Sequence, residues 1–423
     1  MLDPVAYINE PRWHSMDLGL DRTYELLARL GNPQDSLRFV HVAGTNGKGS
    51  ACALSARILQ KAGYKVGLFT SPYLIRFEER IRVDGQDISA ADLYEVTCQV
   101  REAAEAMASH PTEFELMTAV AFLHFARSGC DIVVAEVGLG GRLDSTNVIT
   151  TVEASVIMPI ALDHCAFLGD TIPQIAAEKA GIIKPGVPVV SAPQDPAALD
   201  VIARRAAEQQ AALTVCDASA IAGTNDDFSY REWSDLRLSL QGHYQLANAA
   251  TVLELVGVLR ARGWRLADDA VREGLATTSW PGRFEVVADD PAIIVDGAHN
   301  PQGAAALADE LGRRYAGKRI VFAMGVLSDK DYPAMLASLV PCAAAFVCLT
   351  PPNPRALSAA DLAAAVTEAC EACGHALERP AIVAASIDEA VDAALLLAGP
   401  DDVCVLCGSL YSIGAIKEAL ARR

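Results

Sequence analysis

The stretch His41-Val-Ala-Gly-Thr-Asn-Gly-Lys-Gly-Ser50 decides the fold of the N-terminal part of this chain. Residues 37–42 are short, branched and aromatic and predict a buried strand, and residues 51–63 carry apolar side chains at helical spacing. A strand, a glycine-rich turn and a helix in this order predict a phosphate-binding loop, because backbone N–H groups and the helix N-terminus attract anionic oxygens. Lys48 adds a positive charge for the outer phosphates.

The loop departs from the usual pattern G-x-x-x-x-G-K-[ST] at two positions. Val42 stands where the first glycine belongs, and Gly49 stands where a hydroxyl should follow the lysine. The hydroxyl that binds the metal ion therefore comes either from Ser50 or from another segment. A glycine-rich turn that merely joins a strand to a helix is the alternative explanation.

The composition is that of an ordinary globular protein. The chain has 423 residues, 52% of them hydrophobic and 21% charged, which is enough for two or three cores. A net charge of −18 argues against a nucleic-acid partner, since binding that backbone needs concentrated Lys and Arg. The N-terminus has no signal-peptide pattern and no run is long enough to span a membrane, so we expect a cytoplasmic protein without a membrane partner.

Two later strands are predicted to end in polar side chains. Residues 130–137 form an apolar run closed by Glu136, and residues 154–162 form another that leads into His164. Open α/β sheets bind ligands at the carboxyl ends of their strands, so Glu136 is a candidate magnesium ligand and His164 a candidate ligand of metal or phosphate. A strand-end side chain that is merely solvated is the alternative for each.

Two further segments border this predicted site. Residues 71–85 form a long loop with three arginines, and we expect this loop to cover the site. Lys179 lies on an otherwise apolar helix face, where by default a lysine extends its charged end to solvent.

The alternation of strands and helices restarts after the turn residues Trp280-Pro-Gly-Arg283. Residues 292–296 predict a strand that ends in Asp296, and His299 follows in the next turn, where a second sheet would bind ligands. The predicted fold class is α/β, with a P-loop-containing N-terminal ATPase domain and a smaller Rossmann-like C-terminal domain. We assign these domains to residues 1–281 and 282–423.

Several separated motifs resemble those of one known family. In chain order they are Leu18-Gly-Leu-Asp-Arg22, Gly44-Thr-Asn-Gly-Lys-Gly-Ser50, Thr70-Ser-Pro72, Glu136-Val-Gly-Leu-Gly-Gly-Arg-Leu-Asp144, Leu162-Asp-His164, Glu178-Lys-Ala-Gly181, Pro281-Gly-Arg283 and Asp296-Gly-Ala-His-Asn-Pro301. Together they are similar to bacterial folylpolyglutamate synthases and dihydrofolate synthases, within the Mur ligase superfamily of ATP-dependent amide-bond-forming enzymes. The resemblance covers nearly the whole chain.

The resemblance implies a nucleotide site and a metal site. The residues that correspond to ATP-binding positions are Asn46, Gly47, Lys48, Gly49, Asn248, Arg283 and Asp296. Those that correspond to Mg²⁺ ligands are Ser71, Glu136 and His164. Lys179 matches a lysine that is carbamylated in the family, and a carbamate is a carboxylate-like group able to bind a further, monovalent cation.

The resemblance also implies where the acceptor substrate binds. The positions that correspond to pterin contacts are Met16, Asp17, Leu18, Gly19, Thr112, Glu113, Phe114, Glu115, Leu143, Asp144 and Ser145. The catalytic candidates are Lys48, Lys179 and His299, of which the histidine lies near the incoming glutamate. Tyr73 replaces a family histidine and Ser145 a family alanine, and both changes bear on substrate fit.

By this resemblance we expect a monomeric enzyme that uses ATP to join L-glutamate to a folate, or to dihydropteroate to give dihydrofolate, through an acyl phosphate. One alternative is a cell-wall Mur ligase that acts on a UDP-linked precursor, although such ligases usually carry Gly-Lys-Thr/Ser without the intervening Gly49. The other alternative is a non-catalytic nucleotide-binding switch. A switch would not require Glu136, His164 and His299 together.

Overall fold

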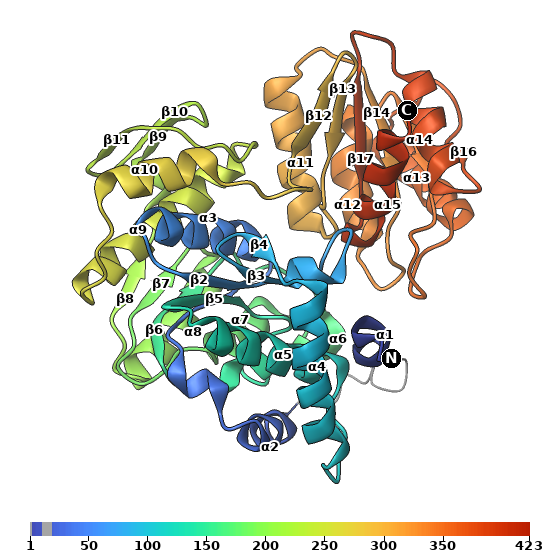
Figure 1. Cartoon of the computed structure of the whole chain (residues 1–423). Helices are drawn as coiled ribbons and strands as arrows, with labels where there is room; N and C mark the ends of the chain where they lie inside the picture. The colour runs from blue at the N-terminus through green and yellow to red at the C-terminus, as the bar shows by residue number, and fades with distance from the viewer. Residues whose placement is uncertain (1, 11–18) are drawn as a thin grey trace. The chain divides into compact units, whose positions relative to one another are not determined.

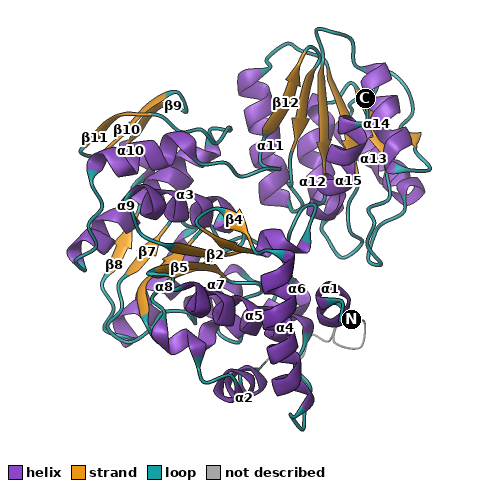
Figure 2. Ribbon diagram, in the orientation of Figure 1, coloured by secondary structure: helices purple, strands orange, loops and turns teal. Residues whose placement is uncertain are grey.

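The computed structural model describes residues 2–10 and 19–423. The chain divides into two compact units, each an α/β body with a sheet and helices of its own (Figures 1 and 2). Unit 1 consists of Met1–Ser239 and Gln245–Ser279. Unit 2 consists of Leu240–Tyr244 and Trp280–Arg423. The predicted α/β fold class is confirmed.

Unit 1 is built on an eight-stranded sheet of order β4-β3-β2-β5-β1-β6-β7-β8. Its strands are β1 (Phe39–Ala43), β2 (Val66–Phe69), β3 (Ile81–Val83), β4 (Gln86–Asp87), β5 (Ile132–Glu136), β6 (Val152–Ile157), β7 (Val189–Ser191) and β8 (Leu213–Val215). Six of them pair in parallel from β2 to β8, and β1, β2, β5 and β6 are buried along their whole length. The parallel strands therefore bring their carboxyl ends to one edge of the sheet.

The remaining elements of unit 1 cover and extend this sheet. The helices are α1 (Pro4–Ile8), α2 (Asp21–Arg29), α3 (Lys48–Lys61), α4 (Ala90–Glu105), α5 (Glu113–Ser128), α6 (Cys165–Leu168), α7 (Ile172–Ala180), α8 (Pro196–Glu208), α9 (Tyr244–Ala261) and α10 (Asp268–Thr277). A small antiparallel sheet contains β9 (Ile221–Thr224), β10 (Asp227–Tyr230) and β11 (Trp233–Leu236).

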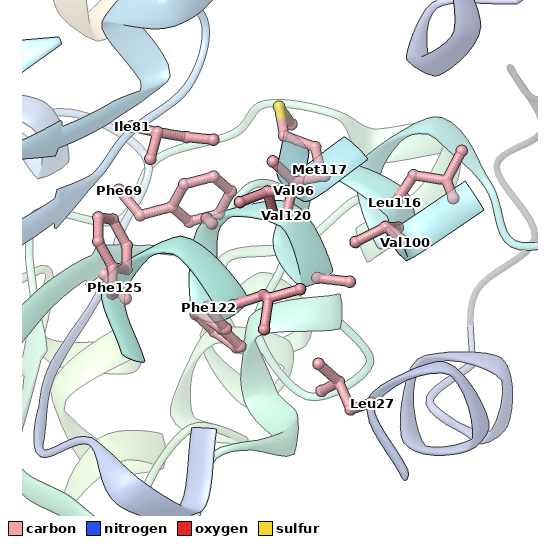
Figure 3. Close-up of a cluster of buried hydrophobic side chains, with 14 of the residues drawn as sticks. Leu27, Phe69, Ile81, Val96, Val100, Leu116, Met117, Val120, Phe122 and Phe125 are labelled. Atoms are coloured by element: carbon pink, nitrogen blue, oxygen red, sulfur yellow. The ribbon is translucent and has the colours of Figure 1, made fainter. Parts of the chain in front are cut away.

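A buried core fixes α4 and α5 against the sheet (Figure 3). Phe122 of α5 packs edge to face on Phe39 of β1 and on Phe69 of β2, with ring centroids 5.2 and 6.4 Å apart. Val96 and Val100 of α4 belong to the same core. Because this packing holds α5 in place, it also fixes the first residues of α5, which are among the predicted pterin contacts.

The expectation that residues 71–85 form only a loop was wrong. The segment contains β3, which pairs antiparallel with β2 and then with β4. The turn between β3 and β4 is Asp84-Gly85, in which both residues have positive φ values of 51° and 79°. Asp-Gly is a strong signal for such a turn, because both central residues of a tight hairpin adopt this conformation.

The strand predicted over residues 154–162 was too long. β6 ends at Ile157, and Pro159 follows, which has no N–H group to continue the hydrogen-bond ladder. Instead, Pro159 O accepts a hydrogen bond from the N–H of Thr45 at 2.9 Å. The residues after β6 therefore run along the phosphate loop instead of extending the strand.

Unit 2 has a six-stranded sheet of order β12-β13-β17-β14-β15-β16. Its strands are β12 (Glu285–Asp289), β13 (Ala292–Val295), β14 (Ile320–Met324), β15 (Ala345–Cys348), β16 (Ile382–Val383) and β17 (Val403–Cys407). Its helices are α11 (Pro301–Arg314), α12 (Tyr332–Leu339), α13 (Ala359–Cys373), α14 (Ile387–Leu397) and α15 (Leu410–Ala421). β12, which the sequence analysis did not predict, runs antiparallel to β13, and the other pairs are parallel.

Each helix in the described part of the chain is too short or too polar to cross a membrane.

Candidate active site

The phosphate loop joins β1 to α3 at the carboxyl edge of the unit 1 sheet. Gly47 has a φ of 82°, and Lys48 is the first residue of α3. The Lys48 ammonium donates to Thr45 O at 3.3 Å and lies 3.9 Å from Glu136 Oε1. The first N–H groups of a helix and an adjacent lysine are the groups that bind phosphate oxygens, so this geometry fits the predicted ATP site.

Helix α9 supports the loop from the side. A Cβ atom at Gly47 would lie only 2.7 Å from Asn248 Oδ1, so this predicted nucleotide residue lies directly against the loop. Asn248 Nδ2 donates to Gln245 Oε1 at 2.8 Å, and Gln245 Nε2 donates to Ser50 Oγ at 3.2 Å. The sequence analysis did not single out Gln245. Its position three residues before Asn248, on the same helix face, is the signal that could have identified it.

Glu136 ends β5 beside the two strands that lead to the phosphate loop and to Ser71. The residue is 4% exposed, and its Oε2 accepts a hydrogen bond from the backbone N–H of Ser71 at 3.1 Å. The structure therefore brings together the Ser71 segment, the Glu136 carboxylate and the Lys48 ammonium. Oxygen donors of this kind are the ligands that Mg²⁺ prefers.

His164 has a more open setting than Glu136. It has the left-handed backbone conformation, with φ 53°, immediately before α6, and its side chain is 32% exposed. Its backbone N–H donates to Asp163 Oδ1 at 2.9 Å, and its ring Nε2 lies 3.9 Å from the same oxygen. Across residues 2–10 and 19–423, no cluster of three or more His, Cys, Asp and Glu side chains could hold a metal ion. The predicted magnesium set contains two such side chains and a hydroxyl.

The expectation that Lys179 extends to solvent was wrong. The side chain is buried in α7, and its ammonium group donates to Gly44 O at 2.8 Å. Burial, and secondly the positive charge of Lys48, lower the pKa of Lys179 to about 7. A substantial fraction of the amine is therefore uncharged and nucleophilic near neutral pH.

The predicted pterin residues fall in three segments, and the structure describes two of them completely. The residues outside its described part are Met16, Asp17 and Leu18. Gly19 lies just before α2. At the start of α5, the Thr112 N–H donates to Glu115 Oε2 at 2.7 Å, and Arg22 Nε donates to the same oxygen at 3.0 Å. The Glu115 carboxylate thus ties the beginning of α5 to α2.

The start of α5 lies against the loop that follows β5. A Cβ atom at Gly138 would lie 2.3 Å from Cζ of Phe114, so the glycine makes room for that ring. Asp144, at the far end of the same loop, is buried, which raises the pKa of its carboxyl group. Glu113 and Leu143 are half-buried, and Ser145 is buried at the start of a 3₁₀ turn. The start of α5 therefore lies against the loop that leads to the predicted pterin residues 143–145.

In unit 2, Asp296 follows β13 and is buried with both carboxylate oxygens occupied. Its Oδ2 accepts the N–H of Phe284, and its Oδ1 accepts the N–H of Ala298, each at 2.7 Å. Tyr244 Oη donates to Oδ2 at 3.4 Å. Burial raises the pKa of Asp296, although the two backbone N–H groups oppose that effect.

The other two unit 2 candidates lie around Gly297. A Cβ atom at Gly297 would lie 2.4 Å from an Arg283 guanidinium nitrogen, so only glycine leaves room for that side chain. The ring Nδ1 of His299 is 2.8 Å from Gly297 O, and because a carbonyl oxygen only accepts, Nδ1 carries the proton of this hydrogen bond. Arg283, Asp296 and His299 are thus grouped around one turn after β13.

Two family models match this chain. The model described as the Mur ligase middle domain matches residues 42–256, which contain the phosphate loop, Glu136 and His164. The model described as the Mur ligase glutamate ligase domain matches residues 282–410, which contain Arg283, Asp296 and His299.

Named relatives and solved structures match over nearly the whole chain. The dihydrofolate synthase/folylpolyglutamate synthase of Bacillus subtilis is 41% identical over 419 residues, which cover 95% of each chain. The Mycobacterium tuberculosis folylpolyglutamate synthase complexed with ADP superposes with a TM-score of 0.89 at 31% identity, covering 100% of both chains. Escherichia coli FolC in complex with DHPP and ADP gives a TM-score of 0.88 at 32% identity, covering 100% of this chain and 98% of that one.

Proposed function

The chain belongs to the folylpolyglutamate synthase and dihydrofolate synthase family of the Mur ligase superfamily, and from that membership we propose which of its residues carry out the reaction. It is an ATP-dependent ligase that joins L-glutamate to a folate or to dihydropteroate. The assignment of residues rests on the position of the Glu136 carboxylate. Its Oε2 accepts the N–H of Ser71, and its Oε1 lies 3.9 Å from Lys48 Nζ at the phosphate loop.

In the first half of the reaction, an acceptor carboxylate oxygen attacks the γ-phosphorus of ATP, which releases ADP and forms an acyl phosphate. Lys48, Asn46, Gly47 and Gly49 hold the phosphates, and Asn248 supports them through its contact with Gly47. The Lys48 charge offsets the negative charge on the transferring phosphoryl group. In the second half, the neutral glutamate amine attacks the acyl carbon, the nitrogen loses a proton to solvent, and the C–O bond to phosphate breaks, so that phosphate leaves.

We assign Mg²⁺ to Ser71, Glu136 and His164. The fit rests on the donor set, a hydroxyl, a carboxylate and an imidazole, and on the burial of Glu136, because a buried carboxylate needs nearby positive charge. When bound, Mg²⁺ would offset phosphate charge during transfer. The Ser71 N–H orients the carboxylate by donating to its Oε2.

Lys179 is the proposed site of carbamylation. Its pKa of about 7 leaves a fraction of the amine neutral, and only the neutral amine can attack CO₂. The nitrogen forms a bond to the carbon of CO₂ and loses a proton to water, which leaves a carbamate anion. That anion would bind a monovalent cation near Gly44, whose oxygen already accepts from the lysine.

The acceptor and glutamate are assigned to the remaining segments. We propose that the pterin contacts residues 16–19, residues 112–115 and residues 143–145, with Phe114 as the aromatic surface. Residues 282–423 form the glutamate-ligase domain, in which Arg283 acts on the nucleotide and His299 on the incoming glutamate. Asp296 serves the nucleotide indirectly, by holding the turn that carries Arg283. A monomer suffices, because one chain carries every part.

The assay is ADP release with ATP, L-glutamate and either dihydropteroate or tetrahydrofolate. We expect release that depends on both the pterin and glutamate, and we expect Glu136→Gln to abolish it while nucleotide still binds. Release with a UDP-linked precursor instead would favour the cell-wall ligase. Turnover with neither pterin would contradict the proposal.

A further inference from the structure

A chain of buried polar side chains connects β1 to the loop after β5. His41 Nε2 lies 2.8 Å from Thr146 Oγ1, and the Thr146 hydroxyl donates in turn to Asp144 Oδ1. His41 and Thr146 are fully buried, and Asp144 is nearly so. Two hydrogen bonds therefore join the strand that carries the phosphate loop to a residue of the predicted pterin loop.

The donor and the acceptor of each hydrogen bond in this chain follow from the number of protons on its side chains. Asp144 Oδ1 also accepts the N–H of Thr146 at 3.0 Å, and Oδ2 accepts the N–H of Leu139 at 2.8 Å, so the carboxylate is an acceptor throughout. The Thr146 hydroxyl has one proton, which it gives to Asp144, so its lone pair must accept from His41. His41 therefore carries its proton on Nε2.

Packing alone does not account for a histidine at this position. Burial, and secondly the charge of Lys184, lower the pKa of His41 to about 3, so the ring is neutral at physiological pH. Its buried Nδ1 has no hydrogen-bond partner in the described part of the chain. An unpaired buried nitrogen is unfavourable, and a leucine at residue 41 would avoid it. What a leucine could not provide is the Nε2–H donor to Thr146.

Each end of this hydrogen-bonded chain lies close to a segment that is assigned to a substrate. His41 lies three residues before Gly44, whose carbonyl oxygen accepts from Lys179. Asp144 closes the loop of residues 138–144 on itself through the N–H of Leu139. The carboxylate accepts from the backbone N–H groups of Gly138, Leu139 and Thr146 and from the Thr146 hydroxyl, and it is the hydroxyl that a side chain of another strand holds in place.

We propose that His41 and Thr146 are positioning residues for the pterin acceptor, because they orient Asp144 and hold its loop against the strand of the phosphate loop. This inference rests on the proposed function, which assigns residues 143–145 to the pterin. Neither His41 nor Thr146 contacts the substrate itself. They act on acceptor binding and leave nucleotide binding to the loop of residues 44–50.

The test compares Thr146→Val, which removes the hydroxyl at nearly constant volume, with Thr146→Ser, which keeps it. Losing hydrogen bonds to a charged group predicts that the Val variant raises KM for the pterin about tenfold or more while KM for ATP changes less than about twofold. The Ser variant should keep the pterin KM within about threefold of wild type. His41→Leu should act like Thr146→Val, and His41→Gln, which retains a donor, should be milder.

The double variant His41→Leu/Thr146→Val should be no worse than Thr146→Val alone, since both changes interrupt one chain. An unchanged pterin KM in Thr146→Val would overturn this inference alone. Equal rises in both KM values, with a lower Tm and no rescue by serine, would show a merely structural role and overturn it as well. If Thr146→Val does not fold, the two His41 variants test the inference by the same changes in KM for the pterin and for ATP. A wild-type protein without pterin-dependent turnover would instead overturn the proposed function, and this inference with it.

Discussion

The carboxyl edges of the two sheets use a buried carboxylate in opposite ways. Glu136 ends one buried strand and Asp296 directly follows another, and each residue is 4% exposed. Glu136 lies near the side-chain charge of Lys48, on a neighbouring strand's loop, and accepts one N–H from Ser71. Asp296 accepts two backbone N–H groups, from Phe284 and Ala298, at 2.7 Å each. The same position in an α/β sheet can thus place a carboxylate beside another side-chain charge or use it to hold the backbone.

The length of the side chain explains much of this difference. The short aspartate reaches the N–H of the residue two positions later, as aspartates do in turns, and Ala298 supplies that N–H. The longer glutamate of β5 extends past its own backbone to the segments beside it. We therefore expect variants at the unit 1 edge to affect chemistry and variants at Asp296 to affect stability.

The largest expected effect is at Lys48. Lys48→Met removes the positive charge beside the phosphates and should lower kcat about a hundredfold to a thousandfold, the cost of losing one preorganised charge-stabilising group. ADP release measures it. Lys61→Met, at the far end of the same helix, is the control and should retain activity. A Lys48 variant with nearly normal kcat would contradict a chemical role for the carboxyl edge of the unit 1 sheet.

Asp296→Ala should act on the fold. It leaves two buried backbone N–H groups without acceptors, which should lower the free energy of unfolding by about 2–5 kcal/mol, measured by urea denaturation. Asp289→Ala, at an exposed residue of β12, should change it little. Weaker nucleotide binding in Asp296→Ala without any loss of stability would contradict the stabilising role assigned to Asp296.

Lys179 should make stability depend on pH. Its pKa falls from 10.5 in the unfolded chain to about 7 in the folded one, so between these values the unfolded state binds more protons. In CO₂-free buffer, the stability of the wild type relative to Lys179→Met should therefore decrease as the pH falls from 10.5 to about 7, and then stay level. Urea midpoints across this range measure the difference. A constant difference would contradict a buried, readily neutralised lysine at this edge.

The smallest effect concerns the segment after β2. The Arg80 guanidinium lies 4.9 Å from the centroid of the Tyr73 ring. Tyr73→Leu removes this cation–π contact and should lower the free energy of unfolding by about 0.5–1 kcal/mol, whereas Tyr73→Phe should keep most of it. Thermal unfolding of both variants is the measurement. Equal losses in the two would assign the effect to the hydroxyl group and not to the ring.

Local sequence patterns predicted several elements of the candidate site. A helix after the phosphate loop and Glu136 at the end of a strand follow from periodicity and glycine placement, which depend on neighbouring residues only, although the helix begins at Lys48 and not at residue 51 as predicted. The motifs that resemble the ligase family also placed Asn248 in the nucleotide site, and the structure puts it against Gly47. The assignment of metal ligands and pterin contacts stays a prediction.

Three features were not evident from local patterns. The length of β6 was overestimated because Pro159 pairs with the phosphate loop and not with a strand. The hairpin of β3 and β4 has a local signal, Asp84-Gly85, but its pairing with β2 does not. Lys179 was expected at the surface, since an apolar helix face does not reveal what packs over it.

By itself, the sequence determined the phosphate loop and most of the order of strands and helices, because these depend on local spacing and on residue types, and its motifs indicated the family and the reaction by resemblance. Only the tertiary structure decided which polar groups are buried and what they bond to. Segments distant in the sequence surround Lys179, donate the Phe284 N–H to Asp296 Oδ2 and join His41 to Asp144 through Thr146. Burial and hydrogen bonding set the charge and the role of a side chain, and both depend on distant packing that no single segment contains.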